Sequence, residues 1–131
     1  MTSRFTELII DAKDPAALAR FWCHVLGYQI VSEEDDVVAI WDRSVEEQER
    51  DQEVRSGPVV PALVFVPVPE EKAVKVRIHI DVNPIDVTQE EEVERLIGLG
   101  ARRVDVGQGD VSWVVLADPE GNEFCVLRSL K

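Results

Sequence analysis

A histidine, a cysteine and a strand carboxylate are the side chains of this chain that could do chemistry. The sequence has only two histidines and two cysteines among its 131 residues. Glu7 lies in F-T-E-L-I-I-D and His79 in R-I-H-I-D-V, and both segments alternate like β-strands. Cys125 follows the turn signal D-P-E-G. Such residues can bind a metal ion, transfer a proton or, as a thiolate, act as a nucleophile.

Each of these residues also has a structural interpretation. His79 fits a hydrogen bond to Glu7 or Asp81, a metal ligand, or an acid–base group. Cys125 fits a small buried apolar residue, a metal ligand, or a nucleophile with His79 as its base. Because an unpaired buried carboxylate is costly, Glu7 predicts either a partner or a wet cavity.

Two similar runs of elements must position these residues. The first run reads strand, helix and three strands, at residues 5–11, 14–27, 28–32, 37–41 and 62–66. The second run repeats that order, at residues 77–82, 88–100, 102–106, 113–117 and 123–127. Asp14 before Pro15 and Thr88 with Glu91 are helix-start signals. We therefore predict an α+β fold of two tandem βαβββ units, about residues 4–68 and 76–129, which pack as a single domain over residues 1–131.

Period-two alternation assigns the first strand of each unit to two faces. It places Ile78, Ile80 and Val82 under the second helix, and it places Glu7 and His79 at matching positions on the face without a helix. We expect the sheets to form one curved mixed sheet around a shared cavity, with the helices on the outside. The candidates for the apolar lining of that cavity are Trp41, Phe65, Val66 and Trp113.

Composition excludes several classes of partner. With 26 acidic and 14 basic residues the net charge is −12, which would repel a nucleic-acid backbone. No apolar run is long enough for a membrane span or a signal peptide, so we expect a cytoplasmic protein with reduced thiols and no membrane partner.

Residues 44–56 are highly charged and predict a solvated loop or short helix, with a mobile lid as the functional alternative.

Several strings of the sequence carry a family resemblance, namely D-P-A-A-L-A-R-F-W with L-G-Y, V-P-V-P-E-E-K, R-I-H-I-D-V, L-G-A-R-R-V and W-V-V-L-A-D-P-E-G-N-E-F-C-V-L. Together they resemble the vicinal oxygen chelate superfamily, which includes glyoxalase I, extradiol dioxygenases and bleomycin-resistance proteins. Within that superfamily the chain is most similar to the glyoxalase-like domains common in bacteria. The resemblance covers nearly the whole chain and implies the doubled βαβββ fold, but one such fold supports many reactions.

The resemblance also implies positions for a metal site. Glu7, Val66, His79 and Cys125 stand where metalloenzymes of the superfamily place their ligands to a divalent ion such as Zn, Fe, Mn or Ni. Val66 cannot bind a metal, and Cys125 stands where a glutamate is usual. The resemblance thus implies an incomplete site, or a mixed three-ligand site of Glu7, His79 and Cys125.

From these features we expect a glyoxalase-like small-molecule-binding protein that sequesters a metabolite or drug. Its ligand-binding residues would be Glu7, Trp41, Phe65, Val66, His79, Trp113 and Cys125. The alternative is a divalent-metal-dependent lyase, isomerase or dioxygenase acting in the same cavity, with Glu7 and His79 as its catalytic candidates. The resemblance further implies a homodimer.

Overall fold

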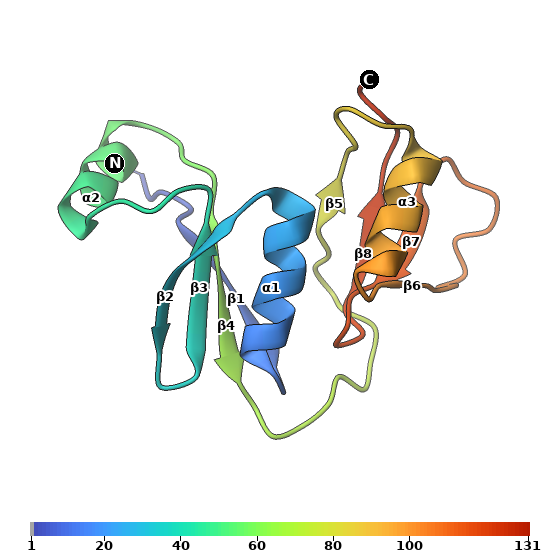
Figure 1. Cartoon of the computed structure of the whole chain (residues 1–131), viewed down its shortest axis with the longest axis horizontal. Coiled ribbons are helices and arrows are strands. Elements are labelled where there is room, and N and C mark those ends of the chain that lie inside the picture. Colours follow the sequence, from blue (N-terminus) through green and yellow to red (C-terminus); the bar gives the residue numbers. More distant parts are fainter. Residues whose placement is uncertain (1) are drawn as a thin grey trace. The chain divides into compact units, whose positions relative to one another are not determined.

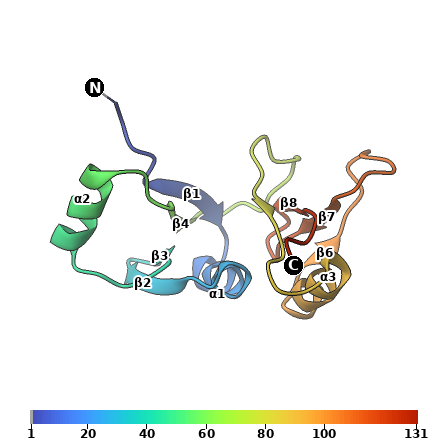
Figure 2. The same cartoon turned by 90° about the horizontal axis from the view of Figure 1, so that it is seen from above.

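The computed structural model describes residues 2–131. The chain forms two compact units, of which unit one ends at Glu70 and unit two begins at Glu71. Figures 1 and 2 show the helices and strands of each unit from two directions.

Unit one contains a four-stranded mixed sheet and two helices. Its elements are β1 (Glu7–Ala12), α1 (Pro15–Leu26), β2 (Gln29–Glu34), β3 (Val37–Trp41), α2 (Glu47–Ser56) and β4 (Ala62–Pro67). The strand order is β1-β4-β3-β2, with β1 parallel to β4 and the other pairs antiparallel. Helix α1 packs on one face of this sheet.

Local signals set the limits of α1 as predicted. The Asp14 carboxylate accepts a hydrogen bond from the Ala17 N–H at 3.1 Å, and Pro15 occupies the first turn. The helix ends at Gly27, whose φ of +70° is the left-handed conformation that glycine tolerates. Leu18 and Trp22 on its inner face are almost completely buried, so α1 supplies much of the core of unit one.

Residues 47–56 form the helix α2, one of the two structures predicted for this charged segment. None of its residues is buried. Arg50 fixes the helix to the sheet, because its guanidinium lies 5.0 Å from the centre of the Trp41 ring and donates to the Thr6 carbonyl at 3.0 Å. The segment is therefore a helix anchored by a cation–π contact.

Unit two repeats the strand order of unit one around a single helix. Its elements are β5 (Asp81–Val82), α3 (Gln89–Gly98), β6 (Arg102–Arg103), β7 (Val114–Ala117) and β8 (Glu123–Val126). The sheet order is β5-β8-β7-β6, again with a parallel pair first. The capping box of Thr88 and Glu91 predicted from the sequence is present, and Val93 and Leu96 of α3 are fully buried. The two βαβββ units and the α+β class are thereby confirmed.

The first strand of unit two is shorter than predicted. Only Asp81 and Val82 form β5, and the chain bends at Arg77 and Ile78. Ile78 is 77% exposed, so its predicted place under the helix is wrong. The period-two argument fails there because residues outside a ladder need not alternate between two faces.

None of the helices formed by residues 2–131 has the length and hydropathy of a membrane span.

Candidate functional site

Unit two contains a cavity of about 320 Å³, within the size range of small-molecule sites. One part of its wall is apolar and consists of Val106, Trp113, Val115 and Leu127. The rest is polar and consists of Lys75, His79, Asp81, Gln108, Glu123 and Cys125. Trp113 is 41% exposed although it is a large aromatic residue, so its ring is available to a ligand.

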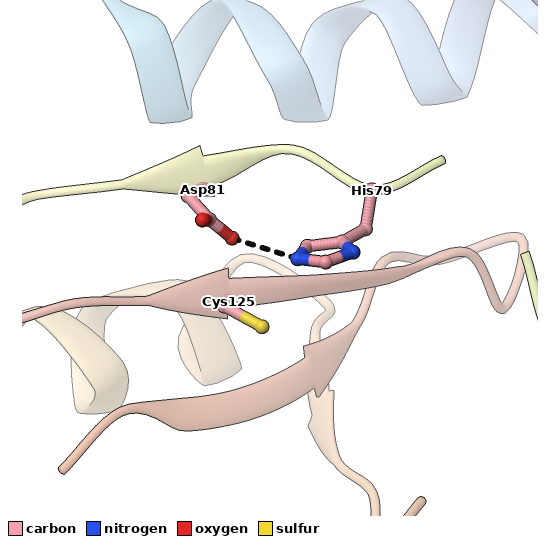
Figure 3. A group of neighbouring side chains, drawn as sticks. All are labelled: His79, Asp81 and Cys125. Atoms are coloured by element: carbon pink, nitrogen blue, oxygen red, sulfur yellow. Dashed lines mark ion pairs between the residues drawn. The ribbon is translucent and has the colours of Figure 1, made fainter. Parts of the chain in front are cut away.

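Three of the polar side chains face one another. His79 Nε2 lies 3.0 Å from Asp81 Oδ1, and one ligand atom each of His79, Asp81 and Cys125 lie within 4.8 Å of one another. Figure 3 shows His79 and Asp81 extending from one segment and Cys125 from the strand beside it. An imidazole, a carboxylate and a thiol are all potential ligands for a divalent metal ion.

The sheet register brings these three residues together. Asp81 and Cys125 are Cα partners on the parallel strands β5 and β8, and the Cys125 N–H donates to the Ile80 carbonyl at 3.0 Å. His79 lies two residues before Asp81. The backbone of two neighbouring segments therefore presents all three side chains to the same cavity.

The surroundings of Cys125 favour its protonated form. The side chain is buried, and this burial raises the pKa of the thiol. Asp81 raises that pKa further through its charge and its hydrogen bond, whereas the Lys75 ammonium acts in the opposite direction. Without a bound cation, Cys125 is thus held as a neutral thiol beside the carboxylate.

Glu123 on β8 holds the chain segment of residues 72–76, which leads into unit two. Its carboxylate accepts hydrogen bonds from Lys72 Nζ at 2.9 Å and from the Val76 N–H at 3.1 Å. Burial acts to raise the pKa of Glu123, but the net pKa is lowered by the hydrogen bonds from Lys72, Val76 and its own backbone together with the positive charge of Lys72. The segment that carries Lys75 towards the cavity is therefore held by an ionised, partnered carboxylate.

The other predicted site residues lie in unit one. Glu7 is on β1, where its carboxylate lies 3.6 Å from Arg50 Nη1. Val66 is half-buried on β4 as the register partner of Asp11. Phe65 is fully buried, and its partners Ile10 and Val38 share its face of the sheet. Because Val66 has no donor atom, the four positions implied by the superfamily fit a divalent ion only in part.

Trp41 lines a more polar hollow of about 450 Å³ in unit one. Its indole N–H donates to the Val60 carbonyl at 2.7 Å, and the Arg43 guanidinium lies 4.8 Å from the ring centre. Arg43 in turn pairs with Asp42 and Glu53. Since Trp41 itself is 2% exposed, it is mainly a packed core residue with one edge at the hollow.

Asp81 was not among the site residues predicted from the sequence. Period two already placed His79 and Asp81 on the same side of their segment, which was the available signal. The neighbourhood of Asp81 and Cys125 depends on how β5 pairs with β8, and no local pattern encodes it. Lys75, Gln108 and Glu123 had no distinguishing motif at all.

Comparisons with known proteins agree with the doubled fold. Residues 7–127 match the glyoxalase-like domain family. No curated protein matches this sequence at a significant level. The chain therefore belongs to the glyoxalase-like domain family and, with it, to the vicinal oxygen chelate superfamily.

Solved structures extend this similarity at low sequence identity. The fosfomycin resistance protein FosX from Mesorhizobium loti has a TM-score of 0.64 and 13% identity, covering 96% of this chain and 92% of that chain. FosX from Listeria monocytogenes has a TM-score of 0.63 and 14% identity, with coverages of 98% and 93%. A glyoxalase/bleomycin resistance protein/dioxygenase family enzyme from Burkholderia phytofirmans PsJN has a TM-score of 0.60 and 17% identity, with coverages of 95% and 97%. At these identities the similarity shows the fold alone.

Proposed function

We propose that this protein binds a small metabolite or drug in the cavity of unit two and sequesters it. The observation that carries the proposal is the combination of apolar lining residues, which include the exposed Trp113, with polar lining residues in the same cavity. Apolar walls supply affinity, and a few polar groups fix the orientation of a ligand. Two of the structurally similar proteins are fosfomycin resistance proteins, which is in keeping with a small-molecule role.

The charge of the protein narrows the class of ligand. A net charge of −12 favours neutral or cationic molecules over polyanions at long range. Within the cavity, Lys75 gives one local site for a single anionic group, such as a carboxylate.

We place this activity in the cytoplasm, because the two cysteines are free and nothing in the composition suggests a nucleic-acid or membrane partner.

A metal-assisted lyase, isomerase or dioxygenase is the second candidate function. The observation that favours it is the group of His79, Asp81 and Cys125 on the cavity wall. A bound divalent ion would polarise an oxygen of the substrate. The two candidates share the cavity but differ in whether ligand binding needs a metal and leads to turnover.

A thermal-shift screen of metabolites and antibiotics on chelator-treated protein tests the proposal. A ligand at one hundred times its Kd should stabilise the folded chain by about 2.7 kcal/mol. Trp113→Ala should raise the Kd of a hit by about tenfold, because it removes the aromatic wall. Calorimetric titration of both proteins gives the two Kd values.

Val31→Ala is the matched control. Val31 is 37% exposed on β2 of unit one, so its truncation removes a comparably exposed apolar side chain that does not line the cavity. The proposal is wrong if no compound stabilises the protein, or if Trp113→Ala and Val31→Ala bind a hit equally well. Mass spectrometry of the hit after incubation with protein distinguishes sequestration from turnover.

A further inference from the structure

The hollow of unit one contains a cationic group that two carboxylates hold against an aromatic ring. The guanidinium of Arg43 lies 4.8 Å from the centre of the Trp41 ring. Its Nη1 donates to Asp42 Oδ2 at 2.9 Å, and its Nη2 donates to Glu53 Oε1. Aromatic rings and carboxylates are the groups with which proteins recognise a planar guanidinium. The hollow is therefore complementary to such a head group, and the chain itself supplies one.

The two carboxylates can accept more hydrogen bonds than Arg43 gives them. Asp42 Oδ1 and Glu53 Oε2 are shielded from solvent, and no group of residues 2–131 donates to either oxygen. Buried acceptors without a donor are unfavourable. A guanidinium that is not tethered to the backbone can adjust its position and donate to more of these oxygens than Arg43 does.

Arg43 can leave the hollow without unfolding an element. Its side chain is 45% exposed, and the residue lies outside β3, which ends at Trp41. Rotation about the side-chain bonds of Arg43 is enough to turn the guanidinium into solvent. The Arg43 position on the ring and its two carboxylate partners then become available to another cation.

The rest of the hollow suits the body of a small molecule. Its volume of about 450 Å³ is within the range of ligand sites. Pro58, Val59 and Val60 line it beside the charged residues, and Val60 is 48% exposed. These side chains can pack against carbon atoms that follow the head group of a ligand.

Charge favours a cation at this place. Residues 42–56 include six acidic and three basic residues, in a chain with a net charge of −12. We propose that the hollow of unit one is a second ligand site, which binds a small guanidinium compound with a short apolar body. Arg43 occupies the head-group position until the compound displaces it. The lining of this site shares no residue with the cavity of unit two, so the proposal is independent of the molecule bound there.

Calorimetric titration of full-length protein with butylguanidinium chloride tests the site. The probe is added up to about 10 mM, because a tethered competitor has an effective concentration in the millimolar range. We expect one butylguanidinium per chain. Butylurea, which has a similar shape but no charge, should bind at least about tenfold more weakly. An equal concentration of NaCl is the control for ionic strength.

Removal of Arg43 should strengthen binding of the probe. Arg43→Ala eliminates the internal competitor, so its Kd for butylguanidinium should fall by about tenfold. The matched control is Arg55→Ala, which removes the same charge from an exposed residue of α2 that does not line the hollow. Its Kd should stay within about twofold of wild type. Circular dichroism establishes that each variant is folded.

A second substitution identifies the carboxylate. In the Arg43→Ala background, Glu53→Gln should raise the Kd by at least about tenfold, because it removes a charged acceptor and keeps the shape of the side chain. Glu49→Gln in the same background removes an equal charge from an exposed residue of α2 and should change the Kd by less than about twofold.

Several results would overturn the proposal. These are equal affinities for butylguanidinium and butylurea, equal Kd values of Arg43→Ala and Arg55→Ala, or equal effects of Glu53→Gln and Glu49→Gln. Binding to Arg43→Ala with none to wild type would show that Arg43 is a permanent structural group. A blocked Gly-Arg-Gly peptide that binds more than about tenfold tighter than butylguanidinium would exclude a small molecule in favour of a protein partner.

Discussion

Cys125 is the residue for which several kinds of chemistry could be imagined from the sequence. A nucleophilic cysteine has a lowered pKa because a cationic neighbour stabilises its thiolate. Here burial and the Asp81 carboxylate both raise the pKa of Cys125, and Lys75 only partly opposes them. The raised pKa therefore disfavours a nucleophilic role for Cys125 and favours a structural thiol or a metal ligand. A bound metal cation would stabilise the thiolate and so reverse the effect of the Asp81 charge on this pKa.

Tyr28 gives a prediction about pH that depends on one residue. Its hydroxyl donates to the Pro61 carbonyl at 2.9 Å. Burial raises the pKa of Tyr28, and the negative charge of Asp42 raises it further. Because the folded-state pKa is the higher one, the contribution of Tyr28 to stability is complete below the unfolded-state pKa of about 10. It is lost as pH rises through the folded-state pKa.

Ultraviolet titration checks this prediction directly, since Tyr28 is the only tyrosine in the chain. We expect the phenolate absorbance of folded protein to appear at higher pH than that of urea-unfolded protein. Tyr28→Phe should show no phenolate step and should lower the free energy of unfolding by about 1 kcal/mol at neutral pH. Coincident titrations of folded and unfolded protein would contradict the assignment.

At the scale of elements, the hairpin of β7 and β8 determines where Cys125 lies. Asp118 is 1% exposed at its turn, and its carboxylate accepts from the backbone N–H groups of Glu120 and Asn122, each at 2.9 Å. The Asn122 side chain donates to the same carboxylate. A buried carboxylate that accepts several hydrogen bonds stabilises the turn that D-P-E-G predicted.

Removing that carboxylate should therefore destabilise unit two. We expect Asp118→Ala to lower the free energy of unfolding by about 2–4 kcal/mol, because buried N–H groups lose a charged acceptor. Asp118→Asn should lose less, since its amide oxygen can still accept. The control Asp110→Ala, at an exposed loop residue, should stay within about 0.5 kcal/mol of wild type in urea unfolding. Equal stabilities of Asp118→Ala and the control would exclude this role for the turn.

The same scale shows which features local sequence can specify. Asp14 and the Thr88 capping box predicted the starts of two helices correctly, because each acts on backbone groups within a few residues. The strand predicted over residues 77–82 was too long, since extension of β5 depends on hydrogen bonds to β8 and not on its own alternation. Ile78 became exposed for that reason.

The candidate site was predictable to a similar degree. His79 and Cys125 were named as candidate site residues from their types and from the family resemblance, and the structure places both in the lining of one cavity. Asp81 was missed as a site residue because its distance to Cys125 follows from a pairing between segments far apart in the chain. The shared cavity around Glu7 and His79 stays a prediction.

For the whole molecule, exposed apolar side chains suggest self-association. Phe5 and Ile9 of unit one are 63% and 53% exposed, and Val74 and Ile78 of unit two are both 77% exposed. A contiguous patch of exposed apolar groups often marks a protein interface. We expect a second copy of the chain to cover some of them, so that the protein in solution has about twice the 14.7 kDa mass of one chain.

Charge should make this association depend on salt. Each copy carries a net charge of −12, so two copies repel at low ionic strength, and added NaCl screens that repulsion. We expect sedimentation equilibrium to give tighter dimers as NaCl is raised.

Ile9→Glu should weaken the dimer at every salt concentration. It adds a negative charge between Glu7 and Asp11 on β1, and in a dimer that charge would be either buried or repelled by its neighbours. Ser32→Glu, on the exposed strand β2, adds the same charge elsewhere and should have only the small effect of net charge. A single-chain mass at high salt, or equal dimerisation of the two variants, would show that the exposed face of β1 is not the interface.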